Sequence, residues 1–386
     1  MGSHVAYRLA EMGYGVVVLE RKERPGEQVC CTGIISQECV SSFAVDDNVI
    51  LRRANSAKLF SPSGRSLRLW REETQACIVD RAAFDQAMAS KAQGKGVDYQ
   101  LNTRVEDITF KDDRVGVEAA RQGERSNFEA RAVVIAAGFG SPLVKRLGLG
   151  QVSNFVVGAQ AEVGTIGVEE VEVEVEVYFG QEIAPGFFAW LVPTSPQTAL
   201  VGLLSRHRPG FYLRKLMSSL LAQGKIVSAE AELSYGGIPL KPLARTFGDR
   251  LLVVGDAAGQ VKPTTGGGIY FGLLCADIAA DTLHRALASN NLSATGLASY
   301  ERGWRRKLGR ELKVEYYARM FYERLTDRQI DRLFDIIKSK GIDEALLKAD
   351  DLSFDWHGEA VLRVLRHRAI SKAVELMKIP FSLASR

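Results

Sequence analysis

The segment "LLVVGDAAGQVKPTTGGGIYF" combines an acidic side chain with glycines at two points. An apolar stretch, Leu251–Val254, leads into Gly255 and Asp256, and the glycines Gly266–Gly268 directly precede an apolar helix that begins at Ile269. Glycine lets the backbone approach a ligand closely, and a helix N-terminus offers free N–H groups and a positive dipole end to an anion. Since Asp256 can also accept hydrogen bonds from a polyol chain, we expect an anionic, hydroxyl-bearing ligand here.

A second pair of residues, Gly2 and Glu20, has the spacing of a dinucleotide site. Gly2 precedes a helix, Ser3–Met12, and the strand Val16–Leu19 then ends on Glu20. In the dinucleotide-binding fingerprint the third glycine lets helix and strand pack closely, and an acid about 20 residues further on binds ribose hydroxyls. The segment therefore predicts the second half of a dinucleotide-binding βαβ unit. The alternative is an ordinary helix–turn–strand that ends in a surface glutamate.

The first half of that unit, a strand and two glycines, is expected upstream of Met1, in about ten residues. The missing strand would lie between Val16–Leu19 and Val133–Ala136, so we expect these two strands not to pair directly.

Two kinds of strand must position these residues. Three short apolar segments, Val16–Leu19, Val133–Ala136 and Leu251–Val254, are typical of a buried parallel sheet and run into glycine or an acid. Ligands bind at the carboxyl ends of such strands. Between the last two, the chain alternates apolar and glutamate residues over Val168–Gly180, which predicts part of an antiparallel sheet. Its glutamates are most simply the wet face of that sheet: Glu169, Glu170, Glu172, Glu174 and Glu176.

The antiparallel sheet is expected to continue through Gly186–Pro193 and Thr198–Leu204. From about Leu292 onward the pattern is helical and charged, with aromatic residues at spacings of buried helix faces. These aromatic residues are Tyr300, Trp304, Tyr316, Tyr317, Phe321 and Tyr322. A basic amphipathic helix over 361–379 has two interpretations: a solvated face on a packed helix, which we favour, or a membrane-surface segment.

Composition limits the classes of function. The chain has 386 residues, enough for two or three domains, and its net charge of +4 is too small to indicate nucleic acid as a partner. No apolar run reaches the length of a membrane span. The five cysteines show no metal-ligand spacing and fit a reducing, cytoplasmic location. Cys30, Cys39, Cys77 and Cys275 are expected to be packing residues.

"GDAAG" followed by "P-x-x-GGGI" resembles the second FAD-binding motif of the flavoprotein hydroxylase and geranylgeranyl reductase superfamily. Val79–Ala92 resembles its segment with an arginine that faces the cofactor, here Arg81. The strand around Val105 resembles the one near the adenine, and Val133–Ser141 resembles the crossover beside FAD. The resemblance implies FAD contacts from Gly2, Ser3, Glu20, Arg21, Arg81, Val105, Gly138, Gly255, Asp256, Pro263, Gly266, Gly267, Gly268 and Ile269.

Two further segments are similar to the geranylgeranyl reductase branch. "CTGIIS" from Cys31 resembles its Cys-x-Gly segment on the flavin side, and "FAWLVP" followed by Gly202 resembles its substrate-cavity motif. This chain departs from that motif at Val192, where the family has Phe, and at Leu204, where it has Gly. The resemblance implies that Phe188 and Trp190 line a cavity and that Cys31 lies by the flavin, where it is our candidate proton donor.

The resemblance thus implies an α/β fold, α+β overall. A Rossmann-like FAD-binding domain would comprise 1–45, 75–150 and 245–290, an inserted antiparallel substrate domain 46–74 and 151–244, and a helical C-terminal region 291–386. The implied reaction is reduction of isoprenoid carbon–carbon double bonds by hydride from reduced flavin.

Because no second G-x-G-x-x-G unit is present, electrons would come from transiently docking NAD(P)H or from a protein such as ferredoxin. The alternatives are an FAD-dependent monooxygenase or halogenase, and an inactive, N-terminally truncated relative. An isoprenoid or lipid substrate would also agree with peripheral contact with a membrane.

Overall fold

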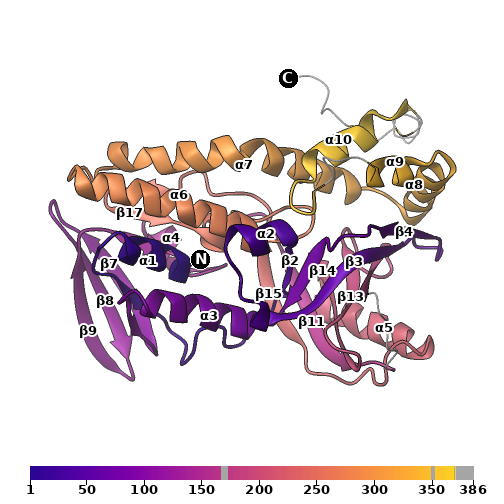
Figure 1. The fold of residues 1–386 in the computed structure, drawn as a ribbon, viewed down its shortest axis with the longest axis horizontal. Helices are drawn as coiled ribbons and strands as arrows, with labels where there is room; N and C mark the ends of the chain where they lie inside the picture. Colours follow the sequence, from indigo (N-terminus) through magenta and orange to yellow (C-terminus); the bar gives the residue numbers. More distant parts are fainter. Residues whose placement is uncertain (167–172, 349–352, 369, 371–386) are drawn as a thin grey trace. The chain divides into compact units, whose positions relative to one another are not determined.

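The computed structural model describes residues 1–166, 173–348, 353–368 and 370, and its chain divides into two compact units (Figure 1). Unit 1 comprises Met1–Val29, Arg81–Phe155 and Ile238–Arg310. Unit 2 comprises Cys30–Asp80, Val156–Gly237 and Glu311–Arg386. Both units are therefore discontinuous in sequence, and each has its own sheets and hydrophobic core.

Unit 1 holds the three apolar strands that the sequence predicts, each of them in a parallel pair. Strand β10 (Val133–Ile135) pairs in parallel with β17 (Leu251–Val253), which also pairs antiparallel with β16 (Phe247–Gly248). Strand β1 (Val17–Leu19) pairs in parallel with β6 (Asp98–Gln100). Since β1 and β10 lie in different sheets, the expectation that they do not pair directly is confirmed.

A three-stranded antiparallel sheet and the helices complete unit 1 (Figure 1). The sheet comprises β7 (Thr103–Phe110), β8 (Val115–Arg121) and β9 (Glu124–Ala130). The helices are α1 (Gly2–Glu11), α3 (Arg81–Gln93), α4 (Pro142–Arg146), the 3₁₀ turn η2 (Gly255–Ala258), α6 (Ile269–Ala288) and the part of α7 (Ala294–Tyr322) up to Arg310. Helix α1 packs on α3 and α6. Its His4 is buried and lies 2.8 Å from Asp277 Oδ1 of α6, so this histidine has a structural role.

Unit 2 is built on a nine-stranded mixed sheet. Its order is β15 (Ser234–Pro239), β11 (Phe155–Gly164), β14 (Thr198–Ser205), β13 (Phe188–Pro193), β12 (Val173–Phe179), β3 (Ile50–Phe60), β5 (Ala76–Val79) and β2 (Ile34–Ser36), with β4 (Ser66–Trp70) paired to β3. Strand β12 pairs antiparallel with β13 but parallel with β3. The expectation of a purely antiparallel sheet is therefore wrong at β12.

The glutamates of β12 are another correction. Residues 167–172, which include Glu169, Glu170 and Glu172, lie outside the described residues. Glu174 accepts hydrogen bonds from Ser56 and Arg68, and Glu176 forms an ion pair with Lys225. The two side chains are only 22% and 17% exposed, because neighbouring elements cover a strand face that the alternation predicted to be wet.

Helices accompany this sheet in unit 2. They are α2 (Gln37–Ser42), the 3₁₀ turn η1 (Asp47–Val49), α5 (Pro209–Ala222), the end of α7, α8 (Asp327–Ser339), α9 (Ile342–Leu347) and α10 (Gly358–Arg366). Of the expected buried aromatic residues, Tyr300, Trp304 and Phe321 are buried, but Tyr317 is 42% exposed. Only the beginning of the amphipathic segment 361–379 is described. None of the described helices is long and apolar enough to cross a bilayer.

Candidate functional site

The loop after β17 in unit 1 has the backbone geometry of a ligand site. Gly255 has a φ of +68°, a conformation that favours glycine. Gly268 closes the loop at the start of α6, where an added Cβ would lie 2.9 Å from Oδ1 of Asp256. Burial raises the pKa of the Asp256 carboxyl, and the nearby positive charges of the Met1 amino group and of Arg81 partly oppose this shift. The loop thus holds a mostly buried acidic group beside a helix N-terminus.

The three glycines before α6 are equally constrained. Gly266 has a φ of +75°, and a Cβ on Gly267 would lie 2.8 Å from Cε of Lys262. The loop is closed by hydrogen bonds between Lys262 and Gly266 (2.9 Å) and between Lys262 and Gly267 (3.1 Å). We call Gly255, Asp256 and the glycines of 266–268 the glycine cradle, because side chains there would fill the space that its backbone leaves beside α6.

The N-termini of α1 and α3 meet the glycine cradle. A Cβ on Gly2 would lie 3.1 Å from Cβ of Ala136, which shows the close approach of α1 to the end of β10. The Met1 side chain reaches both the cradle residue Gly255 and Gly272 of α6, since a Cβ on Gly255 would lie 3.0 Å from Met1 Cγ. Arg81 begins α3 and bonds Asp85 at 2.8 and 2.9 Å. The Met1 amino group and Arg81 both lie close enough to Asp256 to act on the pKa of its carboxyl.

The other predicted residues of unit 1 lie around the same sheets. Glu20 follows β1, and its Oε1 accepts a hydrogen bond from the backbone N–H of Lys22 at 3.0 Å. Arg21 is exposed, and Val105 packs with Leu19 in the core beneath β10 and β17. Gly138 follows β10 with a φ of +71° and open space around it. Ser3 lies in the first turn of α1, Pro263 is buried in the loop, and Ile269 is the first residue of α6.

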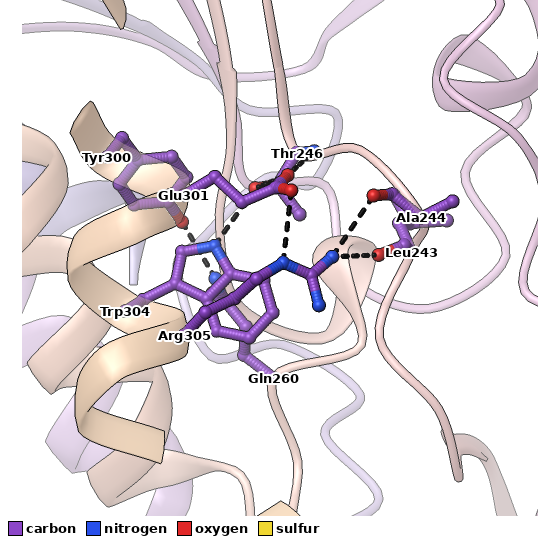
Figure 2. Close-up of polar contacts among 8 residues, drawn as sticks. All are labelled: Leu243, Ala244, Thr246, Gln260, Tyr300, Glu301, Trp304 and Arg305. Atoms are coloured by element: carbon purple, nitrogen blue, oxygen red, sulfur yellow. Dashed lines mark hydrogen bonds and ion pairs between the residues drawn. The ribbon is translucent and has the colours of Figure 1, made fainter. Parts of the chain in front are cut away.

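A polar network that the sequence did not predict lies along α7 and includes Gln260, which follows the cradle residues Gly255 and Asp256 (Figure 2). Gln260 accepts a hydrogen bond from Gly255 N–H and donates one to the hydroxyl of Tyr300, both at 2.8 Å. That hydroxyl donates in turn to the carbonyl of Val253 at 2.8 Å. The end of β17 and the first cradle residue are therefore held by one tyrosine.

The same helix holds the segment before β16. Trp304 Nε1 donates to Thr246 Oγ1 at 3.0 Å, and Glu301 accepts from the N–H and hydroxyl of Thr246 (Figure 2). Arg305 reaches the carbonyls of Leu243 and Ala244 at 3.1 and 3.0 Å. The periodicity of α7 predicted that Tyr300 and Trp304 are buried, but it gave no sign of their polar partners.

Unit 2 places Phe188 and Trp190 on one face of its sheet, with ring centroids 5.9 Å apart. Trp190 lies opposite Gly202 of β14, and a Cβ on Gly202 would lie 2.5 Å from Cε2 of the indole. Trp190 Nε1 is buried without a hydrogen-bond partner among the residues that the structure describes. On its other side, Gly202 lies opposite Gln160 of β11 in the register of the sheet. We call Phe188, Trp190, Gly202 and Gln160 the Trp190 face.

The segment with the predicted Cys31 is attached to this face. Thr32 donates to Gln160 Oε1 at 2.9 Å, and Gly33 N–H lies 3.4 Å from Cys31 Sγ. Gly33 has a φ of +73°, which explains the glycine of the Cys-x-Gly segment. Gln160 was not among the predicted site residues; it is 6% exposed and stands between Ala159 and Ala161 on β11.

The remaining cysteines agree with their predicted packing role. Cys39, Cys77 and Cys275 are buried. Cys30 is half-buried beside Gly236, and burial raises the pKa of its thiol.

Comparison with known proteins decides the family. Residues 40–281 match the family model described as FAD dependent oxidoreductase. A digeranylgeranylglycerophospholipid reductase of Methanocaldococcus jannaschii is 30% identical over 86% of both chains. The chain belongs to the FAD-dependent oxidoreductases, in their geranylgeranyl reductase branch. A relative of the same description, reductase 2 of Methanothermobacter thermautotrophicus, is also 30% identical, over 95% of this chain and 96% of its own.

Solved structures share the fold. A geranylgeranyl bacteriochlorophyll reductase-like protein of Thermoplasma acidophilum aligns with a TM-score of 0.84 and 22% identity over 98% of this chain and 96% of its own. The flavin-dependent brominase Bmp2, as a triple mutant, aligns with a TM-score of 0.70 and 14% identity over 98% of this chain and 96% of its own. At these identities both comparisons show the fold only. The predicted family, fold class and FAD cofactor are confirmed.

The residues of the cradle fit FAD. Tight glycines, a helix N-terminus and a mostly buried carboxylate suit a ligand that has both phosphates and hydroxyls. Glu20 after β1 and Gly2 at the start of α1 stay predicted contacts of the cofactor.

Proposed function

We propose that this protein reduces carbon–carbon double bonds in the isoprenoid chains of a glycerophospholipid, with FAD as its redox cofactor. The observation that carries the proposal is the 30% identity, over 86% of both chains, to a digeranylgeranylglycerophospholipid reductase. In this proposal the glycine cradle would bind the dinucleotide and the Trp190 face would bind the apolar chain.

The cradle residues would hold FAD in the proposed enzyme. The N-terminus of α6 and Arg81 would bind phosphate, Asp256 would bind the ribityl hydroxyls, and Glu20 would bind the adenosine ribose. Gly2, Ser3, Arg21, Val105, Gly138, Pro263 and Ile269 stay predicted contacts around them. Bound and reduced, FAD supplies the hydride that adds to one alkene carbon.

The Trp190 face would bind and orient the prenyl chain. Phe188 and Trp190 present adjacent aromatic rings, and the missing side chain at Gly202 leaves space for the indole beside β14. The second alkene carbon needs a proton, and we assign this role to the Cys31 thiol, which regains a proton from water. The Gly33 N–H, 3.4 Å from Sγ, would orient the thiol.

The two departures from the family motif lie on the same side of the sheet as Trp190. Val192 is fully buried against Ala54 and Ile78, and Leu204 is 1% exposed two residues after Gly202. A smaller side chain at 192 opens space and a larger one at 204 fills it. We propose that this exchange sets which stretch of the prenyl chain is accepted.

Anaerobic turnover tests the proposal. The purified full-length protein should show flavin absorbance, and after reduction with dithionite it should add two hydrogen atoms per double bond to digeranylgeranylglycerophospholipid, as measured by mass spectrometry. A colourless protein that cannot be reconstituted would support the inactive-relative alternative. Oxygen consumption in stoichiometry with an oxygenated or halogenated product would support the monooxygenase or halogenase alternative. No mass gain with any prenyl lipid would refute the proposal.

A further inference from the structure

A basic groove lies between α6 and α7 in unit 1, outside the glycine cradle. Its volume is about 620 Å³, and its lining includes Arg285 from α6 together with Arg302, Arg306 and Lys307 from α7. The lining also includes Ile278 and one acidic residue, Asp281. This volume lies within the range of small-molecule sites, about 300–1,000 Å³.

The lining of the groove carries an excess of positive charge. Asp281 lies 3.1 Å from Nη2 of Arg8 on α1, so its charge is already partly neutralised. Arg302, Arg306 and Lys307 are exposed, and within the described ranges no ion pair involves any of them. Three such cations within two turns of one helix repel each other. A bound anion would remove that repulsion.

The residue types favour phosphate as this anion. A guanidinium group presents a planar fork of donors that matches phosphate oxygens. Arg302 and Arg306 are spaced i,i+4 and therefore lie on one side of α7. The long apolar stems of these side chains can also pack on lipid while their charges stay at the surface.

The groove is separate from the proposed FAD phosphates. The latter would lie at the first residue of α6, Ile269, whereas the groove begins at Ile278. Nine residues of α-helix span about 14 Å. A ligand in the groove is thus not the phosphate group that the cradle would hold.

We propose that this groove binds the phosphate head groups of an anionic lipid surface and so docks the enzyme where its substrate is found. The inference depends on the proposed function for the choice of a lipid, since a reductase of glycerophospholipids must meet a surface of such head groups. The groove would thereby serve the delivery of substrate rather than its chemistry.

Vesicle binding tests this inference. The full-length protein is mixed with phosphatidylcholine vesicles, with or without phosphatidylglycerol at about one third of the lipid, and the bound fraction is measured by flotation. We expect binding to the anionic vesicles only, weakened by salt. The triple variant R302Q/R306Q/K307Q should bind about 100-fold more weakly, at roughly a fivefold loss per cation.

A matched variant separates the groove from net charge. K111Q/R121Q/R125Q removes one lysine and two arginines from exposed positions of unit 1 and should bind vesicles like the wild type. Equal loss in both variants, or equal binding of wild type to neutral vesicles, would overturn the proposal. The proposal would also be overturned if the groove variant bound vesicles normally but its flavin were reduced more slowly by an acidic electron-transfer protein. The groove would then be a docking site for the electron donor.

Reduction of the lipid dispersed in detergent distinguishes this proposal from the proposed function. The groove variant should reduce dispersed lipid at the wild-type rate. If the wild type reduces dispersed lipid but the groove variant still binds anionic vesicles normally, only the docking proposal fails. If the wild type binds anionic vesicles through the groove but reduces no prenyl lipid, only the proposed function fails.

Discussion

The glycine cradle of unit 1 is shaped by the backbone, whereas the Trp190 face of unit 2 is shaped by side chains. In the cradle the backbone makes the site: Gly255 and Gly266 have positive φ, and Gly267 and Gly268 leave no room for a Cβ. On the Trp190 face the side chains make the site, and they come from strands β11, β13 and β14. A site made by the backbone should lose its ligand affinity when a side chain is added to one of its glycines. A site made by side chains should regain activity when a second substitution restores the lost space.

The largest effect is expected for Gly268→Ala in the cradle. The new Cβ would lie 2.9 Å from the Asp256 carboxylate, and overpacking costs about 1–3 kcal/mol. The dissociation constant for FAD should rise by about 100-fold at the upper end of that range. The control Gly15→Ala adds a methyl group where nothing lies within 4 Å and should bind FAD normally, as measured by flavin fluorescence. Normal FAD affinity of G268A would remove the cradle from the site.

The next largest effect is expected for Asp256→Asn, which keeps the shape of the side chain and removes its negative charge. Loss of charged hydrogen bonds should weaken FAD binding about tenfold. The FAD-free protein should instead become more stable at neutral pH, because a raised carboxyl pKa means that stability is present at acid pH and falls as pH rises through that pKa. Denaturant unfolding at several pH values should show this slope in the wild type and in the surface control D112N, but not in D256N.

On the Trp190 face, Gly202→Ala should lower kcat/KM for the prenyl lipid about tenfold without changing FAD affinity. The added methyl group overlaps the indole, whose Cε2 would lie 2.5 Å away. In a G202A/W190F double variant the smaller ring should restore part of the activity, which marks a site made by side chains. A double variant no better than G202A would contradict this difference between the two sites.

The smallest effect is expected from Tyr300→Phe, which leaves Gln260 and the Val253 carbonyl without their shared partner. Such a loss costs about 1–2 kcal/mol of the free energy of unfolding. FAD affinity should fall only slightly, since the cradle glycines stay in place. Y317F, at an exposed tyrosine, serves as the control and should unfold like the wild type.

Features that depend on local backbone geometry could be predicted from the sequence. The strand before Gly255, the glycines before α6 and the alternation of Phe188 and Trp190 are each encoded within a few residues, and the structure agrees with them. The role of Gln260 was not visible, because its partner Tyr300 lies 40 residues away. The glutamates of β12 were assigned to solvent because periodicity gives the faces of a strand but not what covers each face.

The most direct test of the central claim is a single turnover without oxygen. Fully reduced enzyme is mixed with digeranylgeranylglycerophospholipid, and the return of oxidised flavin absorbance is followed by stopped flow. We predict reoxidation in stoichiometry with the double bonds reduced, and none with the fully saturated lipid. Flavin that stays reduced with the prenyl lipid and is reoxidised only when oxygen is admitted would contradict the account.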